Sequence, residues 1–201
     1  MAAQRLSAAA RRAQIATVAA SLFAKKGFAG VTTREIARKA RVNEAILYRH
    51  FPTKEALYTE IINQKIDVKP ETFDCAEVHS GDDRQVFRFV ARYFLNEAEK
   101  DRTFLRLMLY SALEDHALAS VFLKERTGVL FDFILTYIER RMRAGAFRKK
   151  PPAVVLGAFM GMFFHFILAH ELFKIPAHFR VSKEEAIEQY VDIFLHGMCI
   201  S

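Results

Sequence analysis

The sequence predicts an all-α protein with two domains, and three observations support this fold class. Apolar residues recur at helical spacing along most of the 201 residues. Alternation of β-branched and polar residues is nearly absent, and there are only eight glycines and five prolines. We expect about nine helices, three in an amino-terminal domain over residues 1–55 and the others in a second domain over residues 56–201.

The first helix is expected to run from about residue 7 to residue 26. Its apolar residues, from Ile15 to Phe23, fall at positions i, i+3, i+4, i+7 and i+8, on one face of a helix. Gly27 follows, and its tolerance of positive φ suits a helix end. Arg11 and Arg12 before this apolar segment would also suit a signal peptide, but the amphipathic pattern favours a helix that supports the next two.

Two short helices joined by a tight turn are expected between Thr32 and Lys54. Thr32 and Glu35 have the spacing of a capping box at the start of the first helix, and Asn43 can cap the second. Apolar residues, with alanines at the close approach, would be buried where the two helices cross. This pattern predicts a helix-turn-helix, in which the second helix enters the major groove of DNA and the first crosses the backbone.

The net charge supports the same interpretation. Residues 1–60 contain 11 Lys and Arg against four Glu, a net of +7, whereas residues 61–201 contain 19 basic and 19 acidic residues. A solvated basic face is one explanation, and a phosphate-binding face is the other. Because the excess is confined to the segment with the motif, it favours double-stranded DNA as a partner.

The rest of the chain predicts further helices separated by one long polar loop. Thr53 can cap a fourth helix, and the loop is expected over residues 69–83. Apolar faces at helical spacing predict a helix from about residue 84 and later helices at about residues 102–113, 117–144, 153–169 and 183–199.

The segment from Gly27 to Tyr58, GFAGVTTREIARKARVNEAILYRHFPTKEALY, resembles the amino-terminal signature of the TetR family of bacterial transcriptional regulators. The shared features are the Gly-aromatic start, the Thr pair, Ile-Ala, the Ala-x-Val turn, Leu-Tyr and the Lys-Glu-x-Leu of the next helix. The resemblance implies a helix-turn-helix DNA-binding domain followed by an effector-binding and dimerisation domain. It also implies a homodimer, formed by the last two helices of each subunit as a four-helix interface.

The resemblance also implies roles for individual residues of the motif. Arg34 matches a position that can read guanine, for which its forked donors are suited. The positions expected to face base edges are Arg34, Glu44, Ala45 and Tyr48, and those expected to contact phosphates are Thr33, Arg49, His50 and Lys54. The chain departs from the family pattern at Arg41, where a glycine is common in the turn, and at Ala45 and Ile46.

Phenylalanine is concentrated in the second domain, which holds 16 of the 19. At helical spacing these rings suit a filled core as well as the cavity for a small lipophilic or aromatic effector that the resemblance implies. Candidate polar contacts to an effector are Tyr93, Arg106, Tyr110, His116, Tyr137 and His165. His165 interrupts an apolar helix, so we expect it to need a buried partner.

The segment from Ala153 to Ala169 contains His165 as its only polar residue. A membrane span usually needs about 20 apolar residues, so this segment is short for one. The resemblance offers a buried alternative in the dimer interface. The candidate interface residues are Gly157, Gly161, Ile187, Tyr190, Val191 and Phe194.

Catalytic and metal-binding patterns are absent from the sequence. It has no nucleophile elbow, phosphate-cradling glycine loop or His-Glu-x-x-His motif, and Cys75 and Cys199 lack metal-type spacing. We therefore expect no enzyme activity, no cofactor and no metal. The expected function is a cytoplasmic transcriptional repressor that binds its operator as a dimer and is released by an effector. An effector-free DNA-binding regulator and a membrane-tethered sensor are the alternatives.

Overall fold

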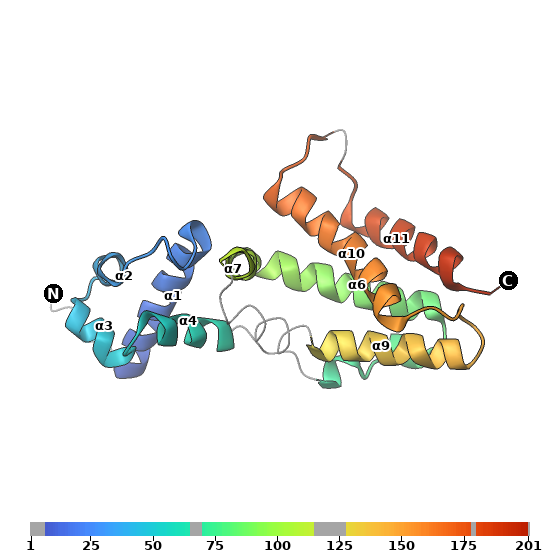
Figure 1. The fold of residues 1–201 in the computed structure, drawn as a ribbon, viewed down its shortest axis with the longest axis horizontal. Coiled ribbons are helices and arrows are strands. Elements are labelled where there is room, and N and C mark those ends of the chain that lie inside the picture. The colour runs from blue at the N-terminus through green and yellow to red at the C-terminus, as the bar shows by residue number, and fades with distance from the viewer. Residues whose placement is uncertain (1–6, 65–69, 115–127, 178–179, 201) are drawn as a thin grey trace. The chain divides into compact units, whose positions relative to one another are not determined.

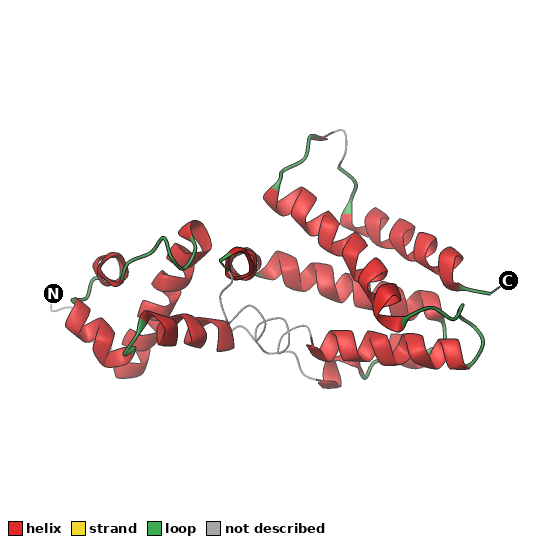
Figure 2. Cartoon of the chain, viewed as in Figure 1, coloured by secondary structure: helices red, strands yellow, loops and turns green. Residues whose placement is uncertain are grey.

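The computed structural model describes residues 7–64, 70–114, 128–177 and 180–200. Within these ranges the chain is helical, and its only β pairing is an isolated antiparallel bridge between Phe147 and Cys199 (Figures 1 and 2). The chain divides into two compact units, Met1–Asp67 with Thr103–Glu125 and Val68–Arg102 with Arg126–Ser201. The predicted boundary at residue 55 therefore falls inside the first unit.

Five helices make up the described part of the first unit. They are α1 (Ala8–Lys26), α2 (Thr33–Lys39), α3 (Glu44–His50), α4 (Lys54–Asn63) and α7 (Arg102–Leu113), of which α7 comes from much later in the chain. The first four were predicted from caps and apolar spacing. The bounds of α1, α2 and α3 confirm those predictions to within a few residues, and α4 begins after Thr53 as predicted.

Side-chain caps begin α2, α3 and α4 as predicted. Thr32, Asn43 and Thr53 accept hydrogen bonds of 2.8–3.1 Å from backbone amides three residues on. The predicted capping box is incomplete, because the Glu35 carboxylate pairs instead with the Lys26 ammonium at 2.8 Å. The caps thus define the starts of both motif helices, and the ion pair joins α2 to the end of α1.

Arg41 lies in the turn between α2 and α3 with a φ of 55°. This left-handed conformation agrees with the expectation for a turn position at which the resemblance implies a glycine, and it costs an L-residue about 1 kcal/mol. The turn is closed by the Val42 amide, which donates to the Ala37 carbonyl at 3.0 Å. The Arg41 side chain is exposed.

Aromatic packing joins α1 to α4 in the core of the first unit. The Phe23 and Tyr58 rings meet edge to face with centroids 5.1 Å apart, and Phe28 stacks on Phe23 at 5.6 Å. Leu47 and Phe51 are fully buried in the same core and hold α3 against it. Each such side chain contributes about 1.5–3 kcal/mol through burial.

Helix α7 is held to α1 and α4 by polar contacts. Tyr58 and the buried Ser111 share a hydrogen bond of 2.5 Å, Arg106 donates to the carbonyl of Ala24, and Tyr110 donates to that of Lys25. Arg106 and Tyr110, which were predicted to contact an effector, make these hydrogen bonds to α1, and their contact with an effector stays a prediction. Apolar periodicity does not show against which domain a helix packs.

In the second unit, helix α6 packs against α5, α10 and α11. Its elements are η1 (Pro70–Phe73), α5 (Ala76–His79), α6 (Asp83–Lys100), α9 (Gly128–Arg143), α10 (Pro152–Ile167), the π-helical η3 (Leu168–Leu172) and α11 (Lys183–Met198). The predicted loop over residues 69–83 therefore contains two short helical segments. The first part of the helix predicted from residue 117, and the candidate His116, lie outside the described residues.

Phe87 on α6 is the centre of the second core. It is 1% exposed, and its ring lies 4.8 Å from the rings of Phe159 on α10 and Phe194 on α11. Ile187 and Val191 on α11 are fully buried in the same unit. Three predicted interface residues, Ile187, Val191 and Phe194, thus belong to the subunit's own core, because α11 packs on α6 with the apolar face that was assigned to a partner.

The outer face of α10 carries apolar side chains that no described element of the second unit covers. Val154 is 65% exposed, and a Cβ added at Gly157 or Gly161 would meet no atom within 4 Å. His165 is exposed on this helix, so the expected buried partner is wrong. Tyr190 of α11 is half-buried against Phe163.

One described segment, Pro152–His170, passes a length and hydropathy test for a membrane span. The same helix buries Phe159, Met160 and Phe163 in the core of the second unit. Core helices of soluble proteins also pass this test, and the packing of α10 against α6 and α11 agrees with that alternative.

Tyr137 on α9 should make the second unit sensitive to alkaline pH. Burial raises the pKa of its phenol above 10.0, and so does the carboxylate of Asp83, which accepts the phenol's hydrogen bond at 2.6 Å. Because the pKa of Tyr137 is higher in the folded state, the protonated phenol stabilises the fold fully below about pH 10. This stabilisation is lost as the pH rises toward the pKa of Tyr137 in the folded state. Urea unfolding at about pH 9 and about pH 11 should show less loss for Tyr137→Phe than for wild type. The exposed Tyr48→Phe is the control, and an equal loss in both variants would contradict the assignment.

Candidate DNA-binding face

Helices α2 and α3 present a polar surface because their apolar sides are buried. Ile36, Ala37 and Leu47 face the core, at 2% exposure or less. Because a helix that buries one side chain per turn leaves the other positions outside, α3 keeps a solvent-facing set of residues. Ala45, Tyr48 and Arg49 are exposed there, so the helix can offer them to a groove.

The predicted base-facing residues fall into two groups. Arg34, Ala45 and Tyr48 are exposed, whereas Glu44 is half-buried. The Tyr48 hydroxyl donates to Thr33 Oγ1 at 3.2 Å, and Thr33 Oγ1 donates to Glu44 Oε2 at 3.2 Å. The structure thus brings Glu44 and Tyr48 together through Thr33, which links α3 to α2.

The predicted phosphate-contacting residues differ in their exposure and in the contacts that they already make. Arg49 is exposed, and His50 is half-buried. Lys54 lies at the start of α4 with its ammonium 4.2 Å from the centroid of the Phe28 ring, and burial lowers the pKa of this ammonium. Thr33 is engaged with Glu44 and Tyr48, as described above.

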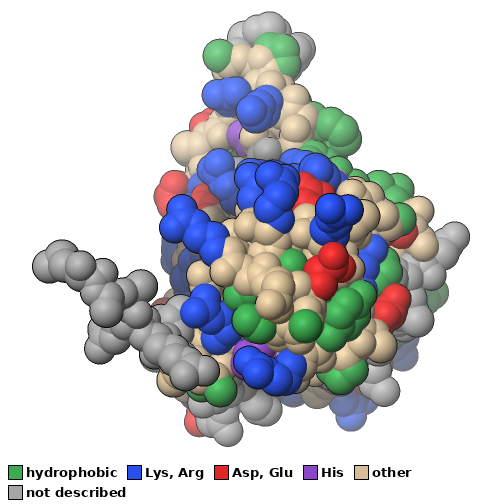
Figure 3. All heavy atoms as spheres, turned by 90° about the vertical axis from the view of Figure 1, so that its left-hand side faces the viewer, with side chains coloured by type: hydrophobic (Ala, Val, Ile, Leu, Met, Phe, Trp, Pro, Cys, Tyr) green, Lys and Arg blue, Asp and Glu red, His purple; other side chains and the backbone are tan. Residues whose placement is uncertain are grey.

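Positive side chains gather around the two motif helices. Figure 3 looks onto the side where α2 and α3 lie and shows Lys and Arg over much of that face. The exposed basic residues on α2, α3 and the turn between them are Arg34, Arg38, Lys39, Arg41 and Arg49. Such a concentration attracts the phosphate backbone of nucleic acids without regard to sequence.

Arg12 is a supporting residue that the sequence analysis did not identify. Its guanidinium donates to the His50 carbonyl, pairs with Glu60 at 3.1 Å and lies 4.2 Å from the centroid of the Phe51 ring. It therefore ties the end of α3 to α1 and α4. No local pattern indicates this role, because its partners are 38 or more positions away.

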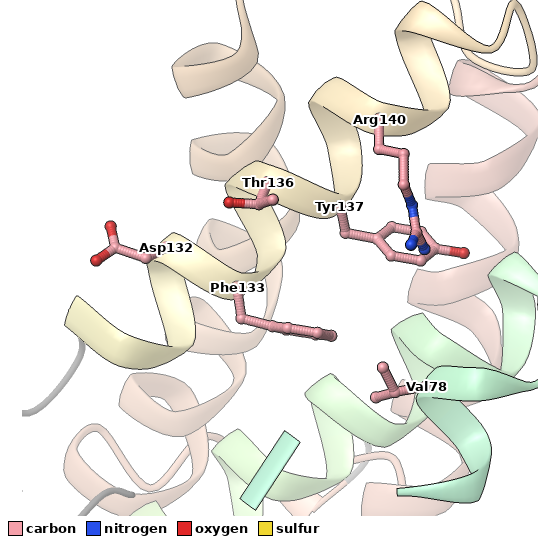
Figure 4. Close-up of a pocket in the computed structure, with 6 residues that line it drawn as sticks. All are labelled: Val78, Asp132, Phe133, Thr136, Tyr137 and Arg140. Carbon is pink, nitrogen blue, oxygen red and sulfur yellow. The ribbon is translucent and has the colours of Figure 1, made fainter. Parts of the chain in front are cut away.

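The second unit contains a pocket of about 330 Å³ between α5 and α9. Phe133 and Val78 provide apolar surface, and the exposed Asp132, Thr136 and Arg140 of α9 also line the pocket (Figure 4). Of the predicted effector contacts, Tyr137 lines this pocket, while Tyr93 packs on Phe73 in the same unit at 5.4 Å. His165 does not line it.

Among the described residues, no group of three or more His, Cys, Asp or Glu side chains is placed to hold a metal ion. Both cysteines are half-buried and unpaired as disulfides.

Comparisons with known proteins agree with this surface. A family model described as "Bacterial regulatory proteins, tetR family" matches residues 15–61, which span the motif. The HTH-type transcriptional activator FasR of Mycolicibacterium smegmatis is 27% identical over 148 residues, covering 74% of this chain and 68% of that protein. The HTH-type transcriptional repressor KstR2 of Rhodococcus jostii is 39% identical over 57 residues, 28% of each chain.

Solved structures share the fold. A crystal structure of AibR in complex with isovaleryl coenzyme A and operator DNA superposes with a TM-score of 0.66 at 22% identity, covering 91% of this chain and 97% of that one. The likeness confirms the predicted arrangement of an amino-terminal helix-turn-helix followed by a helical domain. At this identity it concerns the fold alone.

Proposed function

Because the chain belongs to the TetR family of bacterial transcriptional regulators, we propose that it is a cytoplasmic repressor that binds an operator as a homodimer and leaves it when an effector binds. The observation that carries the DNA-binding part is the surface of α2 and α3. It combines exposed basic residues with exposed Arg34, Ala45 and Tyr48 on two helices that the core holds in place. A surface of this kind supplies both phosphate attraction and contacts to base edges.

The outer face of α10 supports a homodimer. Helix α10 has no Lys, Arg, Asp or Glu, and its exposed positions include Val154, Gly157, Ala158 and Gly161. Exposed apolar faces of this kind usually mark interaction sites, and small residues let two helices approach closely. A two-fold symmetric pair would also supply two reading helices for two half-sites.

The pocket between α5 and α9 supports an effector site. Its apolar floor and polar rim are the pattern of small-molecule sites, and its volume lies at the lower end of their usual range of about 300–1,000 Å³. An effector with a ring or short apolar body would pack on Phe133, with a polar group near Thr136 or Arg140. Such a ligand would release DNA only if it bound one conformation of the protein better than another.

We propose that the protein represses transcription, in line with the name of KstR2, although FasR is named an activator. An effector-free regulator is the alternative, in which the aromatic residues of the second unit are core alone. The packing of Phe87, Phe159 and Phe194 on one another agrees with either version.

The test is binding of the full chain to labelled promoter DNA from beside its own gene, at two salt concentrations. We expect saturable binding that outcompetes random DNA. Arg34→Ala should lower the specific affinity by about tenfold, because a guanine contact contributes about 1–3 kcal/mol. Arg148→Ala removes an exposed arginine of the second unit and is the matched control. Weak binding to all DNA that salt abolishes, with no effect of Arg34→Ala, would contradict the proposal.

The same experiment with a panel of lipophilic and aromatic compounds tests the effector. At least one compound should release the promoter DNA and raise the melting temperature of the free protein. Thr136→Trp, which fills the pocket, should prevent release by that compound while leaving DNA binding intact. Specific binding that no compound alters would favour the effector-free regulator.

A further inference from the structure

Three polar side chains form a chain of hydrogen bonds across the base-facing surface. Tyr48 donates its hydroxyl proton to Thr33 Oγ1 at 3.2 Å, and Thr33 donates its own proton to Glu44 Oε2 at 3.2 Å. Thr33 is the first residue of α2, whereas Glu44 and Tyr48 lie one turn apart on α3. The network therefore fixes the position of one carboxylate relative to both helices of the motif.

Glu44 is the only acidic residue of α3. The turn before α3 and helix α2 carry the exposed Arg41 and Arg34, yet no described residue forms an ion pair with Glu44. A carboxylate repels phosphates, so it weakens the sequence-independent attraction that its neighbours supply. A group that lowers general affinity is useful on such a surface if it selects among bases.

The hydroxyl of Thr33 cannot both donate to Glu44 and donate to a phosphate, which is the contact that the resemblance implies. A threonine hydroxyl has one proton to donate, and phosphate oxygens only accept. In this structure that proton is donated to Glu44, so it is not available to a phosphate. Thr33 is thus a positioning residue for Glu44, and Tyr48 in turn orients the hydroxyl of Thr33.

The base that Glu44 would accept follows from the edges of the four bases in the major groove. Guanine presents two acceptors and thymine one, which repel a carboxylate. Adenine presents an amino donor beside the N7 acceptor, whereas cytosine presents its N4 amino group without an acceptor of its own. We propose that Glu44, held by Thr33 and Tyr48, selects a cytosine in the operator. This inference rests on the proposed DNA-binding function.

Selection of bound sequences from a random double-stranded DNA library, with the full-length protein, tests the proposal. Wild type should enrich sequences with a cytosine at one position of each half-site that Glu44→Ala no longer enriches. Glu44→Gln should enrich adenine there, because an amide can both donate and accept. Replacing that cytosine by 2-pyrimidinone, which lacks the amino group, should weaken wild-type binding about tenfold and Glu44→Ala binding by less than about twofold.

Variants of the positioning residues separate this role from a phosphate contact. Thr33→Val keeps the shape but removes the hydroxyl, and it should reduce the preference for cytosine by about threefold while general DNA affinity is kept. Tyr48→Phe should reduce the same preference, and Thr17→Val, an exposed threonine on α1, is the control. If Thr33→Val instead weakens binding to every sequence equally, Thr33 contacts phosphate and the proposal is overturned.

The same selection distinguishes a failure of the proposed DNA-binding function from a failure of the role proposed for Glu44. If wild type enriches no sequence at all, the proposed DNA-binding function fails and the inference fails with it. If wild type enriches an operator but Glu44→Ala enriches the same bases with equal strength, only the selection by Glu44 is wrong.

Discussion

Replacing Gly161 with glutamate is expected to convert the protein into a monomer and to lower its affinity for a specific operator by about 10²–10⁴-fold, the usual gain from joining two binding modules. The substitution places a charge in the middle of the exposed apolar face of α10. In a dimer this charge would be buried opposite its two-fold copy, without a partner. The oligomeric mass from light scattering and the affinity for the selected operator measure the two effects.

The monomer itself should tolerate this change. A Cβ at Gly161 meets no atom within 4 Å in the subunit, and glutamate is a better helix former than glycine by up to about 1 kcal/mol. Gly128→Glu, at the start of α9 and equally open, is the matched control and should leave mass and DNA affinity unchanged. A Gly161→Glu variant that remains dimeric would show that the interface lies elsewhere.

The first unit was largely predictable because its signals are local. Caps at Thr32, Asn43 and Thr53 act on amides three residues away, and the left-handed Arg41 lies at the turn position where the resemblance implies a glycine. The base-facing and phosphate-contacting assignments remain predictions. The structure adds that Thr33 and Glu44 are hydrogen-bonded to each other, which spacing along the chain does not show.

The second unit was less predictable because its signals are not local. Ile187 has the spacing of a buried helical residue, but periodicity does not distinguish a subunit's own core from a partner. Ile187 packs inside its subunit, and the Arg106 side chain bonds to the Ala24 carbonyl of α1, which is far away in the sequence. His165 was predicted to be buried because its neighbours in the sequence are apolar. It is exposed, because it lies on the outer face of α10.

Phe87→Ala should produce the largest loss of stability in the second unit, about 3–5 kcal/mol in the free energy of unfolding. The Phe87 ring joins elements that are far apart in sequence, with centroids 4.8 Å from Phe159 and Phe194 and 5.8 Å from Tyr137. Alanine would remove these contacts and leave a cavity that rigid neighbouring rings fill poorly.

Urea unfolding followed by far-UV circular dichroism measures this loss, and Phe173→Ala is the matched control because Phe173 is 70% exposed and should change stability by less than about 0.5 kcal/mol. Because the two units have separate cores, the variant should shift the transition of the second unit and leave that of the first in place. A shift of a single common transition would show that the units unfold together, and the helix-turn-helix would then depend on the aromatic core for its own stability. A loss as small as that of Phe173→Ala would mean that the rings around Phe87 close over the cavity.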